Sequence, residues 1–302
     1  MHDKPVVPCL WLDTQAEEAA SFYARTFPGG RVTAVARYPE SFDNPGGRPR
    51  GSVMMIDLEV AGQRFTLLNG GPLFVINPSL SFFVHVTTAD EASRLFTALA
   101  DGGQELMPLG AYPWSERYGW VQDRFGVSWQ VLTGHPAPAG ATIVPCLMFA
   151  GPQAGRAEEA MLAYAGALGS GRVVDVSRYE EGEGRVGWVK HGRFLLAGQD
   201  MIAMDSHLEH GFTFNEAVSL QVMCEDQAEV DRCWAALSEG GEEGPCGWLK
   251  DRYGVSWQVV PSAIGEWMAS EDVAARDRAF RAMLAMKKLD VEKLRAAFRS
   301  TG

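Results

Sequence analysis

Alternating hydrophobic and polar residues predict a β-hairpin in the segment "GWVQDRFGVSWQVL", residues 119–132. Two alternating runs flank a four-residue break, in which Gly126 can adopt the positive φ that such a turn needs. The alternation divides the last strand between two faces, with Val127, Trp129 and Val131 on one and Ser128 and Gln130 on the other. We therefore expect the tryptophan to pack against helices and the glutamine to face the opposite side of the sheet.

The same patterns predict the other elements of the first half. Helical spacing places Ala19, Phe22, Tyr23 and Phe27 on one side of the first helix, and Leu95, Phe96 and Leu99 on one side of the second. The predicted strands are 6–12, 31–38, 52–60, 63–68, 80–87, 117–122 and 127–132, and the predicted helices are 15–26 and 90–100. This half is thus expected to contain two βαβββ units.

The hairpin phrase returns later in the chain, which indicates an internal duplication. "DRFGVSWQV" at 123–131 becomes "DRYGVSWQV" at 251–259, and "RVTAVARY" at 31–38 matches "RVVDVSRY" at 172–179. The order of the repeated phrases is the same in both halves, and a segment rich in Pro, Gly and Ala separates them. We predict a first domain over 1–135, a linker over 136–141, a second domain over 142–262 and a helical extension over 263–302.

The extension occurs once and shows helical rather than strand periodicity. Ser270 is the expected N-cap of a helix over 271–288, and Asp290 is the expected N-cap of a helix over 291–298. Its apolar residues are expected to pack on the repeated body. A lid over a ligand is the alternative.

Composition limits the classes of partner. The 302 residues carry a net charge of -11 without a basic stripe, so neither nucleic acid nor an anionic membrane is an expected partner. The five cysteines show no CxxC spacing, which predicts free thiols and a cytoplasmic location. The N-terminal residues lack the apolar core of a signal peptide, and no apolar run is long enough to cross a membrane.

The repeated units resemble a known family. "CLWLDTQAEEAASFYARTFPGG", "RYGWVQDRFGVSWQV" and "CGWLKDRYGVSWQVVP" are similar to the PhnB-like branch of the vicinal oxygen chelate superfamily, the glyoxalase and bleomycin-resistance fold. The resemblance implies an α+β fold of two tandem domains with paired βαβββ modules, followed by the helical extension. Sequences of this kind often carry the label 3-demethylubiquinone-9 3-methyltransferase. No glycine-rich turn leads from a strand into a helix here, so methyl transfer with a Rossmann-type cofactor site is not expected.

The resemblance also implies positions for a divalent metal inside each cupped sheet. It places Gln130 and Gln258 at one ligand position, Ser81 and Ser219 near a second, and Pro8 and Pro145 near a third. Proline cannot bind through its side chain, and neutral Ser and Gln are weak ligands for such ions. We therefore expect no bound metal and no cofactor. His207 and His210 are the alternative metal ligands, although their segment has the composition of a loop.

Several matched pairs are candidates for contact with a ligand. These candidates are Gln130, Gln258, Ser128, Ser256, Ser81, Ser219, Arg37 and Arg178. Cys9 and Cys146 also occupy matching positions in the two halves. They are expected to be small buried strand residues, and reactive thiols are the alternative. The preferred function is binding of a small, largely apolar molecule without a metal. A metal-assisted lyase, isomerase or dioxygenase and a structural module with filled cups are the alternatives. The two halves are expected to pair within one chain, and a homodimer is a further option.

Overall fold

The computed structural model describes residues 6–134, 142–169 and 171–300, which form four similar modules and a helical extension. The first module contains β1 (Val6–Leu12), α1 (Ala16–Thr26), β2 (Arg31–Arg37), β3 (Val53–Val60) and β4 (Gln63–Asn69). The second contains β5 (Leu80–Val86), α2 (Ala89–Ala100), β6 (Gln104–Tyr112), β7 (Ser115–Gln122) and β8 (Ser128–Thr133). This order matches the predicted βαβββ pattern, with one strand added.

The second repeat follows the same order. Its first module contains β9 (Ile143–Phe149), the 3-10 turn η2 (Gly151–Gln153), α3 (Ala157–Ala167), β10 (Arg172–Arg178), β11 (Val189–Leu196) and β12 (Gln199–Asp205). Its second module contains β13 (Val218–Cys224), α4 (Gln227–Ser238), β14 (Glu242–Glu243), β15 (Trp248–Lys250) and β16 (Ser256–Pro261). The extension consists of α5 (Ala263–Met268), α6 (Val273–Leu284) and α7 (Val291–Arg299). The tandem α+β architecture with a helical end is therefore confirmed.

Each eight-stranded sheet combines one module from each repeat. One sheet has the order β14-β15-β16-β13-β1-β4-β3-β2, and the other has the order β10-β11-β12-β9-β5-β8-β7-β6. Antiparallel pairing of β1 with β13 and of β5 with β9 joins the modules in the middle of each sheet. The sequence correctly indicates two modules per repeat, but the modules that share a sheet come from different repeats. The two halves thus pair within one chain.

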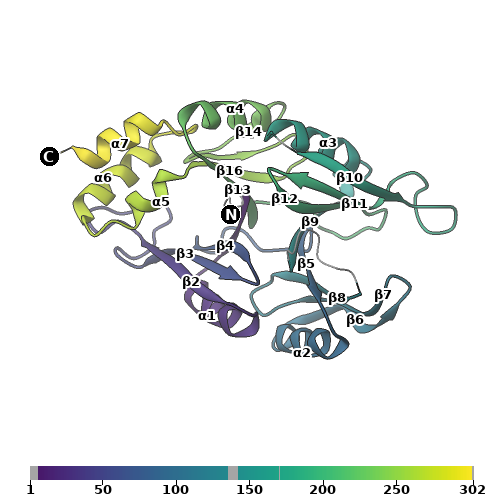
Figure 1. The fold of residues 1–302 in the computed structure, drawn as a ribbon. Coiled ribbons are helices and arrows are strands. Elements are labelled where there is room, and N and C mark those ends of the chain that lie inside the picture. The colour runs from purple at the N-terminus through teal and green to yellow at the C-terminus, as the bar shows by residue number, and fades with distance from the viewer. Residues whose placement is uncertain (1–5, 135–141, 170, 301–302) are drawn as a thin grey trace.

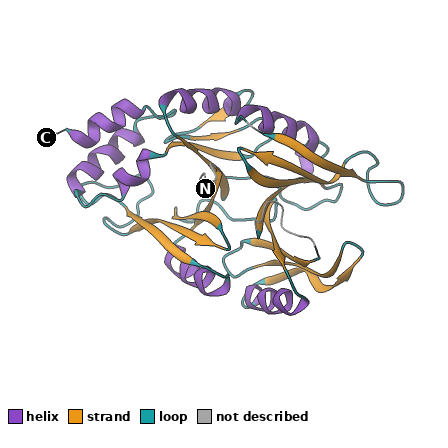
Figure 2. Ribbon diagram, in the orientation of Figure 1, coloured by secondary structure: helices purple, strands orange, loops and turns teal. Residues whose placement is uncertain are grey.

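The two sheets curve into cups that open to opposite sides of the molecule (Figure 1). We call the concave face of the sheet containing β1 cup A and that of the sheet containing β5 cup B. Helices α1 to α4 lie in two pairs outside the sheets, α1 with α2 and α3 with α4 (Figure 2). The main hydrophobic core includes Leu10, Phe65, Phe82, Trp129 and Trp257, which lie on the sides of the strands away from the cups.

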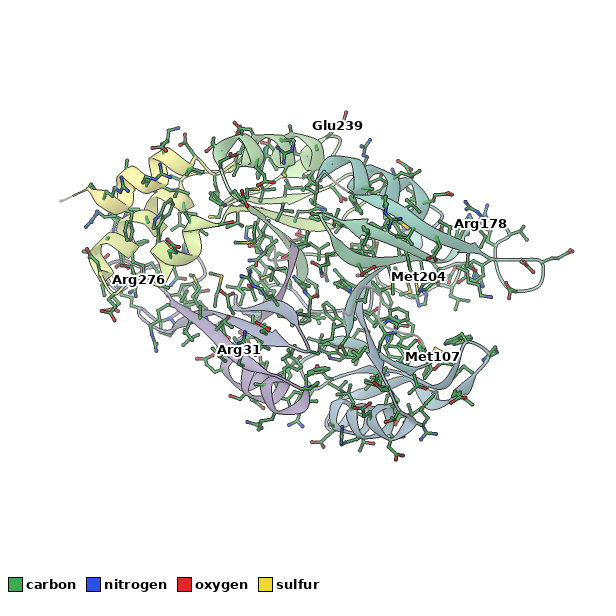
Figure 3. All side chains as sticks on the ribbon, viewed as in Figure 1. Arg31, Met107, Arg178, Met204, Glu239 and Arg276 are labelled. Atoms are coloured by element: carbon green, nitrogen blue, oxygen red, sulfur yellow. The ribbon has the colours of Figure 1, made fainter. Side chains whose placement is uncertain are left out.

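The helical extension joins the two rims of cup A. Near one rim, the backbone N–H groups of Cys246 and Gly247 donate to the carbonyls of Met286 and Lys287. Near the other rim, Asp277 Oδ2 accepts from the backbone N–H groups of Glu40 and Ser41 at 3.0 and 2.8 Å, in the loop after β2. Arg276, labelled in Figure 3, lies in this bridge above β2. No hydrogen bond among the described residues connects the rims of cup B in this way.

Two sequence predictions need correction. Strand β6 was not expected over 104–112, where Pro108 and Gly110 interrupt the alternation; the structure accommodates them on an edge strand with three register shifts. Helix α6 begins after Asp272, whose side chain accepts from Ala275 N, rather than after Ser270. The Ser270 side chain instead accepts from Asp272 N within the preceding turn.

Candidate functional site

The repeated phrase forms the predicted hairpin turn and encloses a buried carboxylate. Asp123 Oδ1 accepts from the backbone N–H groups of Phe125 and Val127 at 2.9 and 3.0 Å. Its Oδ2 accepts from Tyr23 OH at 2.7 Å and from Trp129 Nε1 at 2.8 Å. Gly126 takes a φ of +85°, as the turn requires. The phrase therefore encodes a turn, its carboxylate acceptor and one donor to that carboxylate.

The second copy repeats this arrangement around Asp251. Tyr253 N and Val255 N donate to its Oδ1 at 2.8 and 3.0 Å, whereas Tyr164 OH and Trp257 Nε1 both donate to its Oδ2 at 2.7 Å. Burial raises the pKa of Asp123 and of Asp251, and these hydrogen bonds oppose the rise. Since Tyr23 and Tyr164 come from α1 and α3, each clamp links the two modules of one repeat, which belong to different sheets. Its role is structural.

The expected orientation of the phrase is confirmed. Trp129 and Trp257 are 1% and 0% exposed, and the Trp129 ring contacts Phe27, which follows α1, with 4.9 Å between ring centroids. The neighbouring glutamines project to the other face, where Gln130 Nε2 donates to Ser81 Oγ and Gln258 Nε2 donates to Ser219 Oγ, both at 2.9 Å. Gln130 and Gln258 therefore lie in cups B and A respectively.

Cup A contains a row of polar side chains that crosses its sheet. Thr66 Oγ1 donates to Asp57 Oδ1 at 2.8 Å and lies 3.0 Å from Gln221 Oε1. Gln221 Nε2 donates to Gln258 Oε1 at 3.2 Å, which extends the row to Ser219. Because these residues come from four adjacent or nearly adjacent strands of one sheet, their hydrogen bonds fix the relative positions of both repeats.

Cup B is mainly apolar. Its concave face holds a hydrophobic cluster separate from the main core, formed by Phe83, Tyr118, Leu132, Val144, Cys146 and Ile202. Half-buried Met107, Tyr112, Trp120 and Met204 pack against this cluster. Met107 and Met204 come from the two opposite arms of the sheet (Figure 3). The cup thus presents aromatic rings and flexible thioethers over its centre.

A few polar groups lie beneath the apolar cluster of cup B. Tyr118 OH donates to Gln130 Oε1 at 2.6 Å, and Trp120 Nε1 donates to Ser128 Oγ at 2.7 Å. Burial raises the pKa of the Tyr118 hydroxyl, so it stays protonated at neutral pH. A ligand in this cup would meet an apolar surface with hydroxyl and amide groups close below it.

Cys9 and Cys146, rather than Pro8 and Pro145, lie on the cup faces. Cys9 is opposite Ser219 across the β1–β13 pair and beside Thr66 on β4, whereas Pro8 is opposite Leu220 on the other face. The family-based placement was therefore shifted by one residue, which reverses the face in a strand. Burial raises the pKa of Cys9 to about 12, against opposing hydrogen bonds with Gln258 and Ser219. Cys9 is a neutral, buried thiol and not an activated nucleophile.

The side chains on the cup faces do not fit a divalent metal. A neutral thiol, hydroxyls and amides supply little charge for such an ion, and Asp57, the one carboxylate in the polar row of cup A, accepts from Thr66. In the described part of the chain, no group of three or more His, Cys, Asp or Glu side chains could hold a metal ion. No chemical step through a metal is therefore derived.

The arginine candidates do not enter the cups. Arg37 is exposed on edge strand β2 and donates to the Gly51 carbonyl at 3.1 Å. Arg178, on the other sheet's edge strand β10, forms an ion pair with Glu158 of α3 at 2.7 Å. Both guanidinium groups therefore form their contacts at the outer edges of the sheets, outside the cups. Ser256 lies beside Ser219 in the register of cup A, and it is buried.

The histidine candidates lie in the predicted loop after β12. His210 Nε2 is 2.6 Å from Ser206 Oγ, and burial lowers the pKa of His210. The His207 ring packs against Tyr179 with 5.5 Å between centroids. The sequence did not identify Asp57, Thr66 and Gln221 as site residues, although each lies two residues from another polar residue of the same strand, namely Glu59, Arg64 and Ser219 respectively.

Paired βαβββ modules that form cupped eight-stranded sheets define a protein of the vicinal oxygen chelate superfamily. The model of the family described as 3-demethylubiquinone-9 3-methyltransferase matches residues 4–132 and again 141–260. The chain belongs to this PhnB-like family, and it carries the family's domain twice.

The chain is also similar to several solved structures. The PhnB protein from Bacillus cereus is 34% identical over 42% of this chain and 98% of its own length, with a TM-score of 0.39. A protein from Pseudomonas aeruginosa is 31% identical over 41% of this chain and 93% of its own, with a TM-score of 0.35. Glyoxalase I from Zea mays is 12% identical over 85% of this chain and 94% of its own, with a TM-score of 0.53, and it shows the likeness of fold alone. No curated protein matches the chain.

The helices of the described residues include none that is long and apolar enough to span a bilayer.

Proposed function

We propose that the protein binds a small, largely apolar molecule in cup B, without a bound metal. The observation that carries this proposal is the separate hydrophobic cluster on the concave face of that sheet, with Met107 and Met204 packed on it. Such a cluster is not needed to join the sheets, because the main core already does so. Thioether side chains can move between rotamers, so they can open space for an incoming ring or chain.

The polar groups of cup B support this class of ligand. Apolar pockets commonly contain a few polar groups that orient the bound molecule. Gln130, held between Tyr118 and Ser81, and Ser128, held by Trp120, are groups of this kind. The ligand-facing set is therefore proposed as Gln130, Ser128 and Ser81 in cup B. Gln258, Ser256 and Ser219 occupy the matching positions of cup A.

Cup A is less suited to an apolar ligand. Its central row contains Asp57, Thr66 and Gln221, and the helical extension joins its rims. Methyl transfer, which the family description names, is not part of the proposal. Gly70 and Gly71 follow β4 and lead to β5, so they do not open a helix at which a cofactor could bind.

Binding of 2-naphthol, an apolar ring with one hydroxyl, tests the proposal. We expect saturable quenching of tryptophan fluorescence, since Trp120 lies in the cup. Met204→Trp should fill cup B and remove this binding. Leu68→Trp is the matched control, because Leu68 occupies the position in cup A that Met204 occupies in cup B.

The same titration can overturn the proposal. If folded wild-type protein gives no saturable quenching with this probe, the side chains fill cup B permanently and the structural alternative is favoured. If Leu68→Trp removes binding and Met204→Trp does not, the ligand occupies cup A instead.

A further inference from the structure

A cleft of about 670 Å³ lies outside both cups, between α1 and α2. Its walls come from the end of α1 and the exposed side of α2, and its floor comes from the last residues of β5. The volume is in the range of sites that bind small molecules. Because the cleft is on the helix side of the molecule, an occupant would not enter either cup.

Two arginines on opposite walls give the cleft a positive charge. Arg25 belongs to α1 and Arg94 to α2, and both side chains are exposed. Among the described residues, neither guanidinium has an ion pair or hydrogen bond. Glu91, one helical turn before Arg94, instead accepts from the backbone N–H groups of Thr87 and Thr88 at 3.1 and 3.2 Å. Glu91 therefore caps the start of α2, and among the described residues it forms no ion pair with Arg94.

The second repeat lacks this pair of arginines. Gly166 of α3 occupies the position of Arg25, and Arg232 of α4 occupies the position of Arg94. Arg232 forms an ion pair with Glu229 at 3.0 Å. The duplication therefore does not explain the arginine pair.

Apart from Glu91, the rest of the cleft is apolar or neutral. Phe27, Val84 and Leu95 are buried at its base, and Phe22 lines one wall. Guanidinium groups bind carboxylates with paired, charge-assisted hydrogen bonds. We propose that this cleft binds a carboxylate amphiphile, with the carboxylate between Arg25 and Arg94 and the apolar chain on Phe27, Val84 and Leu95. This site is independent of the function proposed for cup B.

Calorimetric titration of the full chain with decanoate tests this site, with decanol as the neutral comparison. We expect decanoate to bind at least tenfold more tightly than decanol. Arg25→Gln combined with Arg94→Gln should reduce the affinity for decanoate at least tenfold. These side chains are exposed, so the double variant should fold with an unchanged Tm.

Filling the cleft separates this site from the others. Ala98→Trp should abolish decanoate binding, whereas Ala236→Trp, the matched change on α4, should leave it unchanged. Met204→Trp in cup B should also leave it unchanged. Equal affinity of wild type and the double arginine variant would overturn the proposal, as would equal affinity for decanol. Loss of decanoate binding in Met204→Trp would place the ligand in cup B, which would overturn this inference and not the proposed function.

Discussion

Cups A and B descend from the same modules, yet their concave faces differ in chemistry. The retained pairs include Cys9 with Cys146, Ser219 with Ser81, Ser256 with Ser128, and Gln258 with Gln130. The pairs that differ include Asp57, Thr66 and Gln221 of cup A, which correspond to Arg193, Ile202 and Phe83 of cup B. In cup A the retained residues come from β1, β13 and β16, whereas two of the changed residues come from β3 and β4 and the third, Gln221, comes from β13.

The difference shows that residues on the concave face of a duplicated sheet can change while the residues that pack its other face are retained. On the other side of each sheet, the tryptophan and the aspartate clamp are the same in both repeats. In cup A the exchanged residues bond to one another, so a polar row is stabilised. In cup B, Arg193 pairs with Asp175 and Asp200 at 3.2 and 3.6 Å, which leaves Ile202 and Phe83 to the apolar cluster.

The largest expected effect tests whether the tryptophan and aspartate clamps of the two repeats contribute equally to stability. Trp129→Ala and Trp257→Ala should each lower the free energy of unfolding by about 3 to 5 kcal/mol, because each removes a fully packed ring and a donor to a buried aspartate. Urea denaturation measures both. Leu162→Ala, at a site 60% exposed, is the control and should change the free energy by no more than about 0.5 kcal/mol. A small loss for one tryptophan alone would show that the two clamps contribute unequally.

Reciprocal exchange of one differing pair tests the chemistry of the cup faces. Thr66→Ile should cost about 1 to 3 kcal/mol, because it removes hydrogen-bonding partners of Asp57 and Gln221 in a buried row. Ile202→Thr should cost a similar amount by placing a hydroxyl in the apolar cluster. Chemical denaturation at neutral pH checks both. If either exchange leaves the free energy of unfolding unchanged, the polar or apolar character of that cup face does not contribute to stability.

The sequence predicted the parts of this comparison that depend on local pattern. The hairpin, the opposed faces of Trp129 and Gln130, and the tandem modules all follow from alternation and repetition. The exchange of modules between sheets does not follow from them, because either pairing satisfies the same local alternation. Placement of Cys9 required a register correct to one residue. Asp57 and Thr66 come from different strands, and the alternation within each strand does not show that their side chains meet.

The hydrogen bonds of the two cup glutamines are expected to contribute to stability, because both side chains are buried. Gln130 and Gln258 are 2% and 6% exposed, and each bonds to two buried side chains. Truncation to Ala should therefore cost about 1 to 3 kcal/mol.

The bridge over cup A provides a further test of the difference between the cups. Asp277→Ala removes the acceptor of two backbone N–H groups in the loop after β2, at a side chain that is 3% exposed. Local opening of residues 38–52 should become easier by about 1 to 3 kcal/mol. Hydrogen exchange should accelerate there, whereas residues 179–188 at the rim of cup B should be unchanged. Equal acceleration at both rims would mean that the variant loosens the whole protein.

The smallest expected effect concerns the retained cysteines. In cup A, Cys9 lies between Ser219 on β13 and Thr66 on β4, so a serine hydroxyl at this position has hydroxyl groups on both sides. In cup B, Cys146 belongs to the apolar cluster and lies between Ser81 on β5 and Ile202 on β12. Cys9→Ser should therefore change the free energy of unfolding by less than about 1 kcal/mol, and Cys146→Ser should cost about 1 kcal/mol more. Thermal denaturation of both variants measures this difference. A larger loss for Cys9→Ser would indicate that the polar row of cup A depends on the size of the thiol rather than on its hydrogen bonds.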